Sequence, residues 1–168
     1  NEIVALMALS RLDGIGDKRR ACLLEAFGSA REALDVPVSR WAPVLGLSLA
    51  ALERARSSLD PQWAQARLAS LEARGGRAVV RQDHGYPELL QQLTSPPPVV
   101  FVLGASGLLS QAHCVAVVGT RKPSRAGVAM ARRIATGLAA RGFCVVSGMA
   151  IGIDTAAHAG ALEAGGRT

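Results

Sequence analysis

Residues 115–125 read Val-Ala-Val-Val-Gly-Thr-Arg-Lys-Pro-Ser-Arg, and this stretch decides how the second half of the chain is organised. Its first four residues are all apolar, which is typical of a strand buried on both faces of a parallel sheet. A glycine and a basic segment follow, and helical spacing of apolar residues begins at about Arg125. The stretch therefore predicts a strand, a short polar turn and a helix in direct succession.

The same pattern is repeated immediately downstream. The first helix is expected to cover about residues 125–141 and to end at a glycine. Apolar residues 143–146 then form the next strand, residues 147–153 form a Gly-rich turn, and a helix runs from an N-cap at Asp154 to about Ala164. Strand, helix, strand and helix joined by short turns indicate βαβ units in a parallel sheet.

The rest of the chain changes character at about residue 75. Residues 1–75 show short helical patterns, whereas apolar strands are expected at 77–81 and 99–103. The expected helix N-caps in the first part are Ser29, Ser48 and Asp60. We predict an α/β fold in two domains, a small all-helical domain over residues 1–75 and the first part of a parallel-sheet domain over residues 76–168.

Apolar spacing also indicates which side chains are buried. Val128, Ile134 and Leu138 are expected on the buried face of the helix over residues 125–141. The three cysteines lie in apolar segments and are Cys22, Cys114 and Cys144. Because they are far apart in the sequence and lack the spacing of metal ligands, we expect buried thiols in a reducing cytoplasm.

The turn at residues 119–125 is the strongest candidate binding site. It follows a strand and opens a helix, where outward N–H groups and the helix dipole favour an anion. Ligands of open parallel sheets bind beyond the carboxyl ends of the strands, where this turn lies. Its candidate contacts are Gly119, Thr120, Arg121, Lys122, Ser124 and Arg125. The alternative is a surface loop whose basic side chains are merely solvated.

The turn at residues 147–153 opens on the same edge of the predicted sheet. Because adjacent parallel strands lie about 5 Å apart, the two turns can share one groove for an anion. Its two glycines and small alanine permit close approach of a ligand to the backbone. Asp154 is interpreted as an N-cap, and His158 has the spacing of an Asp–His pair on one helical face, with a structural role.

Several kinds of chemistry have no support in the sequence. The turn at residues 119–127 does not fit the dinucleotide pattern, and no phosphate-binding loop of the ATPase type occurs. His84, His113 and His158 are scattered, so neither a metal site nor a catalytic triad is predicted. We expect no catalytic residues, no metal and no cofactor. No apolar run is long enough for a membrane span, and no signal peptide is visible.

Positive charge is concentrated in the last third of the chain. Residues 112–168 hold seven basic and two acidic side chains, whereas residues 1–60 hold eight of each. The whole chain carries a formal charge of +6, and arginine, which binds phosphate through two parallel hydrogen bonds, supplies most of its cations. This asymmetry makes a polyanion a plausible partner.

Read together, the two turns resemble the DNA-processing protein A family, also called DprA or Smf. The residues that carry the resemblance are Val115–Arg121, Ser124, Gly127, Gly142, Val146–Asp154, Ala157, His158, Ala161, Leu162 and Gly165. Residues 86–90 and 97–101 also fit the lead-in segment of the family. The helical first part is similar to the SAM-like or helix-hairpin-helix domain that many members carry, and the second part to their Rossmann-like domain.

The resemblance implies a protein of the bacterial cytoplasm that binds single-stranded DNA without catalysing a reaction. Such proteins protect incoming strands during natural transformation and help to load the RecA recombinase. The Rossmann-like domain of the family holds the DNA and commonly forms a homodimer. The residues that match the family's two DNA-site motifs are Gly119, Thr120, Arg121 and Ser124, and then Ser147, Gly148, Ala150, Gly152, Ile153 and Asp154.

Two other functions remain open at this stage. One is a nucleotide-processing enzyme of the lysine-decarboxylase-like, or phosphoribohydrolase, type, whose Rossmann-like units look similar. It would need a catalytic glutamate on a later strand, and no such segment occurs in these 168 residues. The other is duplex DNA binding by the Gly-Ile-Gly turn at residues 14–16, which is followed by Lys18, Arg19 and Arg20.

The extent of the chain is a further expectation. The family's later strands, another basic residue of the groove and a downstream loop are missing from the sequence. A sheet with only its first strands would leave an unpaired apolar edge, which proteins normally avoid. We therefore expect the chain to be part of a longer protein.

Overall fold

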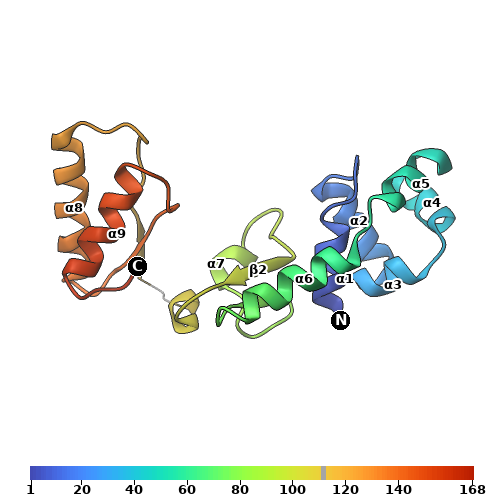
Figure 1. Cartoon of the computed structure of the whole chain (residues 1–168), viewed down its shortest axis with the longest axis horizontal. Coiled ribbons are helices and arrows are strands. Elements are labelled where there is room, and N and C mark those ends of the chain that lie inside the picture. The colour runs from blue at the N-terminus through green and yellow to red at the C-terminus, as the bar shows by residue number, and fades with distance from the viewer. Residues whose placement is uncertain (111–112) are drawn as a thin grey trace. The chain divides into compact units, whose positions relative to one another are not determined.

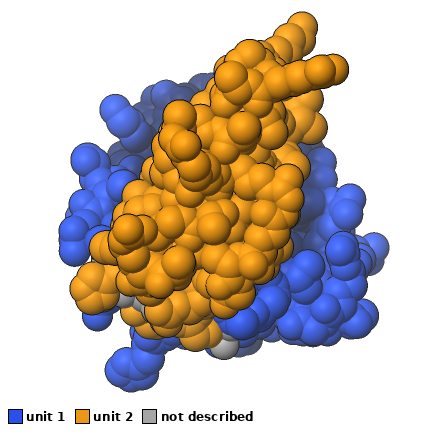
Figure 2. Space-filling view, turned by 90° about the vertical axis from the view of Figure 1, so that its left-hand side faces the viewer, with its two compact units in different colours: residues 1–106 blue, residues 107–168 orange. Residues whose placement is uncertain are grey.

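The computed structural model describes residues 1–110 and 113–168, which fall into two compact units. Unit 1 covers Asn1–Ser106 and unit 2 covers Gly107–Thr168, shown in blue and orange in Figure 2. Along the described residues, no helix combines the length and apolar character needed to cross a membrane.

Unit 1 begins with a group of short helices (Figure 1). They are α1 (Glu2–Leu9), α2 (Asp17–Phe27), α3 (Ala30–Asp35), the 3-10 helix η1 (Val38–Trp41), α4 (Ala42–Leu45), α5 (Leu49–Ser57) and α6 (Pro61–Glu72). The three predicted N-caps are confirmed. Ser29 Oγ accepts the N–H of Glu32 at 3.1 Å, Ser48 caps α5, and Asp60 caps α6. Polar side chains at these positions satisfy N–H groups that a helix cannot bond internally.

The core of the helical part is built around Trp41. Its side chain is fully buried, and its Nε1–H donates to the carbonyl oxygen of Ala33 at 2.8 Å. The Arg56 guanidinium lies 5.1 Å from the centre of the Trp41 ring and donates to the carbonyl oxygen of Leu34 at 2.5 Å. Leu9, Leu23 and Leu52 are also fully buried in this core. One aromatic residue with its polar N–H satisfied therefore links α3, η1 and α5.

A two-stranded antiparallel ladder belongs to the same compact unit. Strand β1 (Arg77–Val80) pairs with β2 (Val99–Val102), and α7 (Glu88–Gln91) lies between them in the sequence. Val80 and Val99 pack against the helical core around Trp41. This packing explains why unit 1 extends past residue 75, where we placed the domain boundary. The division into independently folding domains at that residue stays a prediction.

Unit 2 contains the predicted strand–turn–helix repeats. Strand β3 (Cys114–Ala116) pairs in parallel with β4 (Cys144–Val146), and helices α8 (Arg125–Ala139) and α9 (Ile153–Glu163) follow them. The short 3-10 helix η2 (Ser106–Ser110) precedes β3. Cys144 also forms a parallel bridge with Arg167, so β4 has a neighbour on each side. The predicted α/β class and parallel pairing agree with this arrangement.

Helices α8 and α9 lie side by side, as Figure 1 shows, and small residues allow the contact. A Cβ atom at Gly160 would lie 2.3 Å from the carbonyl oxygen of Arg132, so only glycine fits there. Ala131, Ala135 and Ala139 form the buried stripe of α8. The prediction that Ile134 is buried was wrong, since its side chain is 48% exposed.

The cysteines differ in their surroundings. Cys22 is exposed on α2, so its predicted burial was wrong. Cys114 and Cys144 lie directly opposite each other on β3 and β4. Burial raises the pKa of the Cys144 thiol, and the neighbouring Cys114 raises it further. The folded state therefore favours the protonated form of Cys144.

Replacing Cys144 by alanine is expected to reduce the decrease in the free energy of unfolding that occurs as the pH rises. A raised pKa in the folded state adds stability that is complete below the thiol's unfolded pKa of about 8.5 and is lost as pH rises through the folded value. Urea unfolding on either side of that pH measures the slope. The exposed-thiol control Cys22→Ala should keep the wild-type slope. An unchanged slope in Cys144→Ala would show that this thiol does not contribute.

Candidate anion-binding site

The structure brings the two predicted turns together at the carboxyl ends of β3 and β4. The N–H of Val117 donates to the carbonyl oxygen of Val146 at 3.0 Å, and Ser147 Oγ donates to the carbonyl oxygen of Val117 at 2.7 Å. The N–H of Ile153 donates to the carbonyl oxygen of Thr120 at 3.2 Å. Residues 117–125, called the first loop and ending with the first residue of α8, and residues 147–152, the second loop, are thus fixed against each other.

The first loop presents its cations to solvent. Ser124 is the N-cap of α8, and its Oγ accepts the N–H of Gly127 at 3.1 Å. Arg121, Lys122 and Arg125 are all exposed. Within residues 1–110 and 113–168, none of the three takes part in an ion pair. Their charge is therefore not neutralised by a carboxylate of the described chain.

Thr120 shapes the same loop. Its Oγ1 accepts the N–H of Lys122 at 3.1 Å, which turns the backbone just after β3. The hydroxyl groups of Thr120 and Ser124 accept these bonds and keep their own hydrogens, so both can still donate to a ligand. This geometry is compatible with Thr120 and Ser124 as candidate contacts of a ligand.

Asp154 organises the second loop from within. It is only 6% exposed, and its Oδ2 accepts the N–H of Gly148 at 3.0 Å and that of Ala150 at 3.3 Å. We predicted that Asp154 is the N-cap of α9, but Gly152 holds that position. The reason is that α9 begins at Ile153, so the carboxylate reaches back to the loop instead. The N–H groups of Gly148 and Ala150 are consequently committed to Asp154 and not to a ligand.

Two glycines allow the loops to approach. Gly152 has φ of 96°, and a Cβ atom there would lie 2.4 Å from the carbonyl oxygen of Thr120. A Cβ atom at Gly119 would lie 2.8 Å from Cγ1 of Ile153. Side chains at either position would force the first and second loops apart, so glycine is required for close packing.

His158 does not pair with Asp154 as its spacing had indicated. Its Nδ1 lies 2.6 Å from Oγ1 of Thr168, and that hydroxyl donates to the carbonyl oxygen of Val145 at 2.8 Å. Because the hydroxyl hydrogen is used on Val145, His158 Nδ1 must be the donor to Thr168. In the described part of the chain its Nε2 is buried without a hydrogen-bond partner. His158 therefore ties α9 to the segment that follows it.

Sequence reasoning missed the apolar side chains of the two loops. Met149 is 84% exposed, Ile151 is 71% exposed and Val118 is 69% exposed. Val118 was expected in a strand buried on both faces, and that prediction was wrong because β3 ends at Ala116. The position of Met149 and Ile151 between two glycines of a turn is the sequence signal that could have indicated their exposure.

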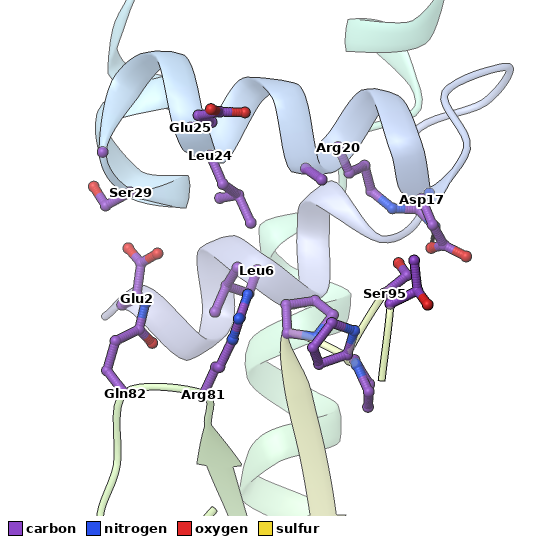
Figure 3. Close-up of a pocket in the computed structure, with 16 residues that line it drawn as sticks. Glu2, Leu6, Asp17, Arg20, Leu24, Glu25, Ser29, Arg81, Gln82 and Ser95 are labelled. Atoms are coloured by element: carbon purple, nitrogen blue, oxygen red, sulfur yellow. Dashed lines mark hydrogen bonds and ion pairs between the residues drawn. The ribbon is translucent and has the colours of Figure 1, made fainter. Parts of the chain in front are cut away.

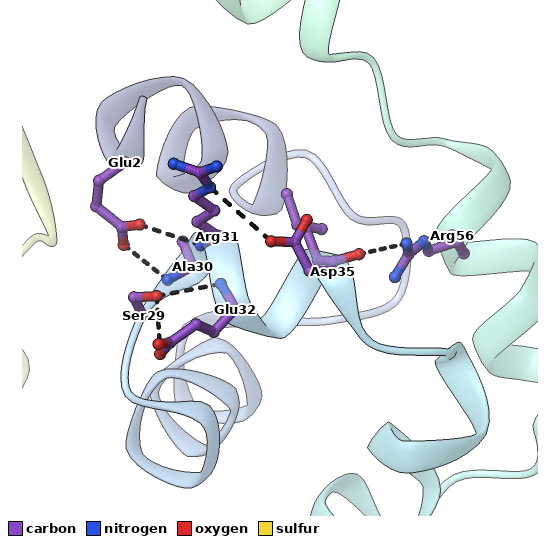
Figure 4. Close-up of polar contacts among 8 residues, drawn as sticks. Glu2, Ser29, Ala30, Arg31, Glu32, Asp35 and Arg56 are labelled. Carbon is purple, nitrogen blue, oxygen red and sulfur yellow. Dashed lines mark hydrogen bonds and ion pairs between the residues drawn. The ribbon is translucent and has the colours of Figure 1, made fainter.

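Unit 1 holds a separate cavity of about 600 Å³, shown in Figure 3. Most of the charged side chains that line this cavity already form hydrogen bonds or ion pairs within unit 1. Arg20 pairs with Asp17 and also donates to the carbonyl oxygen of Ile15 at 2.6 Å. Glu2 accepts the N–H groups of Ala30 and Arg31 at 2.7 and 3.1 Å, as Figure 4 shows. These groups support the helix ends and offer little to a ligand.

The Gly-Ile-Gly turn at residues 14–16 forms part of this helical support. Gly16 is the N-cap of α2, and Ile15 is buried in the core around Trp41. Arg20 donates to the carbonyl oxygens of Ser10 and Ile15, so its charge is directed inward. Duplex DNA binding by this turn stays untested. Across the described ranges, no three His, Cys, Asp or Glu side chains are placed to hold a metal ion.

Comparison with known proteins finds a family and curated relatives that match somewhat more than half of the chain. A family model described as DNA recombination-mediator protein A matches residues 77–168, more than half of the chain. The Smf protein of Synechocystis sp. is 43% identical over 89 residues, which cover 51% of this chain and 22% of that protein. The DNA processing protein DprA of Bacillus subtilis is 34% identical over 101 residues, which cover 60% of this chain and 34% of that protein.

A solved structure is similar to nearly the whole chain. The X-ray structure of DNA processing protein A (DprA) from Streptococcus pneumoniae aligns with a TM-score of 0.72 at 25% identity. The alignment covers 95% of this chain and 53% of that one. The chain therefore spans about half the length of the solved relative and about a third or less of the two curated relatives.

Replacing Gly152 by alanine is expected to destabilise unit 2 by about 2 kcal/mol or more, because it combines a strained φ with a backbone clash. Gly165→Ala is the matched control, since Gly165 has φ of 64° with open space around its Cβ position. It should cost only about 1 kcal/mol. Chemical unfolding measures both. Equal losses in the two variants would contradict the close contact between the loops.

Proposed function

Because this chain belongs to the DNA recombination-mediator protein A family, we propose that it binds single-stranded DNA without reading its sequence. The contact surface is the pair of loops at residues 117–125 and 147–152. We further propose that the bound strand is passed to a RecA-type recombinase, in the cytoplasm, during DNA uptake and recombination. In this proposal the chain binds and delivers DNA and does not catalyse a reaction on it.

One observation carries the DNA-binding proposal. The two acidic residues of residues 112–168 are both engaged within unit 2. Asp154 bonds loop N–H groups, and Glu163 pairs with Arg132, whose Nε lies 2.6 Å from Oε2. The cations of the first loop are therefore unopposed at the start of α8, where the helix dipole adds to their field. Such a surface attracts phosphate groups.

The composition of the surface favours contacts with the sugar-phosphate backbone of DNA over recognition of its bases. Arginine, lysine, hydroxyl groups and N–H groups bind phosphates of any sequence. Thr120, Arg121, Lys122, Ser124 and Arg125 supply these groups on exposed backbone. Binding without sequence preference and with strong dependence on salt follows from this kind of contact. In the proposal Gly119 and Gly152 contribute by letting the two loops meet. Ser147, Gly148 and Ala150 belong to the second loop, which we propose lies against the DNA.

Two structural parts of the proposal rest on the family. We propose that the helices of residues 1–75 form the SAM-like or helix-hairpin-helix domain, as the short helices and the turn at residues 14–16 support. We also propose a homodimer formed through unit 2. The description of the family as a recombination mediator supports a recombinase as the partner.

Arg121→Ala is expected to weaken binding of fluorescent oligo-dT about tenfold, because a charge-assisted contact to phosphate is lost. The dependence of log K on log salt should also become shallower by about one phosphate contact. Fluorescence anisotropy at two salt concentrations measures both quantities. Arg40→Ala, which removes an exposed arginine of unit 1, is the charge-matched control and should bind as the wild type does. Equal affinities for Arg121→Ala and the wild type would refute the site.

The same titration separates the other functions. A duplex of equal length tests the turn at residues 14–16, and preference for the duplex that Gly14→Ala abolishes would replace the present proposal. Release of base from nucleoside monophosphates would instead support the phosphoribohydrolase type of enzyme. Tighter binding of oligo-dT than of duplex, with no release of base, is the expected result.

A further inference from the structure

Three large apolar side chains stand on the two loops that carry the proposed phosphate contacts. Val118 directly precedes Gly119, whereas Met149 and Ile151 lie on the second loop. Their exposed fractions are 69%, 84% and 71%. Exposed apolar residues scattered singly are ordinary, but a group on joined loops beside a cationic turn points to a binding surface.

The backbone at Met149 adds a second observation. Its φ is 57°, in the left-handed region, and it is the one described non-glycine residue with positive φ. That conformation costs about 1–2 kcal/mol for a residue with a Cβ atom. Glycine could occupy the position without that cost, as it does at residue 152. A strained residue whose side chain lies in solvent stabilises nothing in the fold, which indicates a role in binding.

The second loop is held rigidly on both sides of Met149. The N–H groups of Gly148 and Ala150 bond to the buried carboxylate of Asp154, and Thr155 Oγ1 donates to the carbonyl oxygen of Ala150 at 2.9 Å. The side chain of Met149 is therefore displayed from a fixed backbone. A preorganised surface of this kind loses little entropy when a ligand binds.

We propose that Val118, Met149 and Ile151 form an apolar platform for the unstacked bases of a single strand whose phosphates lie on the first loop. This inference rests on the proposed function and explains how the protein distinguishes single strands from duplexes. The bases of a single strand expose their faces, whereas a duplex buries them by stacking. A methionine thioether makes favourable contacts with aromatic rings, and apolar contact with a base face does not depend on sequence.

Nucleobases fit this surface better than another protein does. The N–H of Ile153, which directly follows the second loop, donates to the carbonyl oxygen of Thr120 and so holds the second loop against the cationic first loop. A ligand that covers the platform must therefore also accept a cluster of positive charge. Single-stranded nucleic acid carries apolar base faces and negative phosphates on one chain, which matches both properties.

The test compares oligo-dT with an abasic oligonucleotide of equal length, which keeps the phosphates and lacks the bases. Met149→Gly removes the side chain and relieves the strained φ, so the variant should fold at least as well as the wild type. It is expected to lower the affinity for oligo-dT about fivefold and to leave the affinity for the abasic strand unchanged. Ile151→Ala should act in the same direction. Leu162→Ala, a 64% exposed apolar residue late in α9, is the control and should change neither affinity.

The outcomes separate this inference from the proposed function. If the wild type binds neither oligonucleotide, the proposed function fails and the platform fails with it. If the wild type binds both strands equally, or if Met149→Gly lowers both affinities to the same extent, DNA binding stands and the platform is refuted. Self-association that Met149→Gly abolishes, with unchanged affinity for oligo-dT, would assign the surface to a second copy and would also refute it.

Discussion

The N–H groups of Gly148 and Ala150 donate to the buried carboxylate of Asp154, and the arrangement of unit 2 depends on these two hydrogen bonds. These hydrogen bonds fix the backbone of a glycine-rich turn. They also supply donors to the carboxylate of a residue that is only 6% exposed. Ile153, one residue earlier, then bonds to Thr120 and sets the position of the first loop. The fixed backbone of the second loop follows from this carboxylate, and the close approach of the two loops also requires Gly119 and Gly152.

Local patterns predicted the framework because they report local physics. The apolar runs after residues 113 and 142 form the paired strands β3 and β4, although only β4 is largely buried, and Ser29 and Asp60 cap helices as expected. The cationic turn was also visible, because Arg121, Lys122 and Arg125 are neighbours in sequence. Its structural setting, after a strand and before a helix, follows from the same patterns.

What the sequence could not predict depends on contacts between elements. The approach of α8 to α9 at Gly160 favours alanine in the interface, so Ile134 faces solvent although its spacing suited a core position. Because α9 starts at Ile153, Asp154 does not cap this helix and instead stabilises the second loop. Packing of Val80 and Val99 on the helices placed β1 and β2 in unit 1. Each of these outcomes depends on close packing between elements, which the spacing of residues along the sequence does not predict.

The central claim is that the exposed cations of the first loop bind the phosphates of a single strand. The most direct measurement is the affinity of the whole chain for oligo-dT over a series of salt concentrations. Three phosphate contacts predict a linear fall of log K against log salt with a slope of about −2. A slope near zero, or no binding at low salt, would contradict the account.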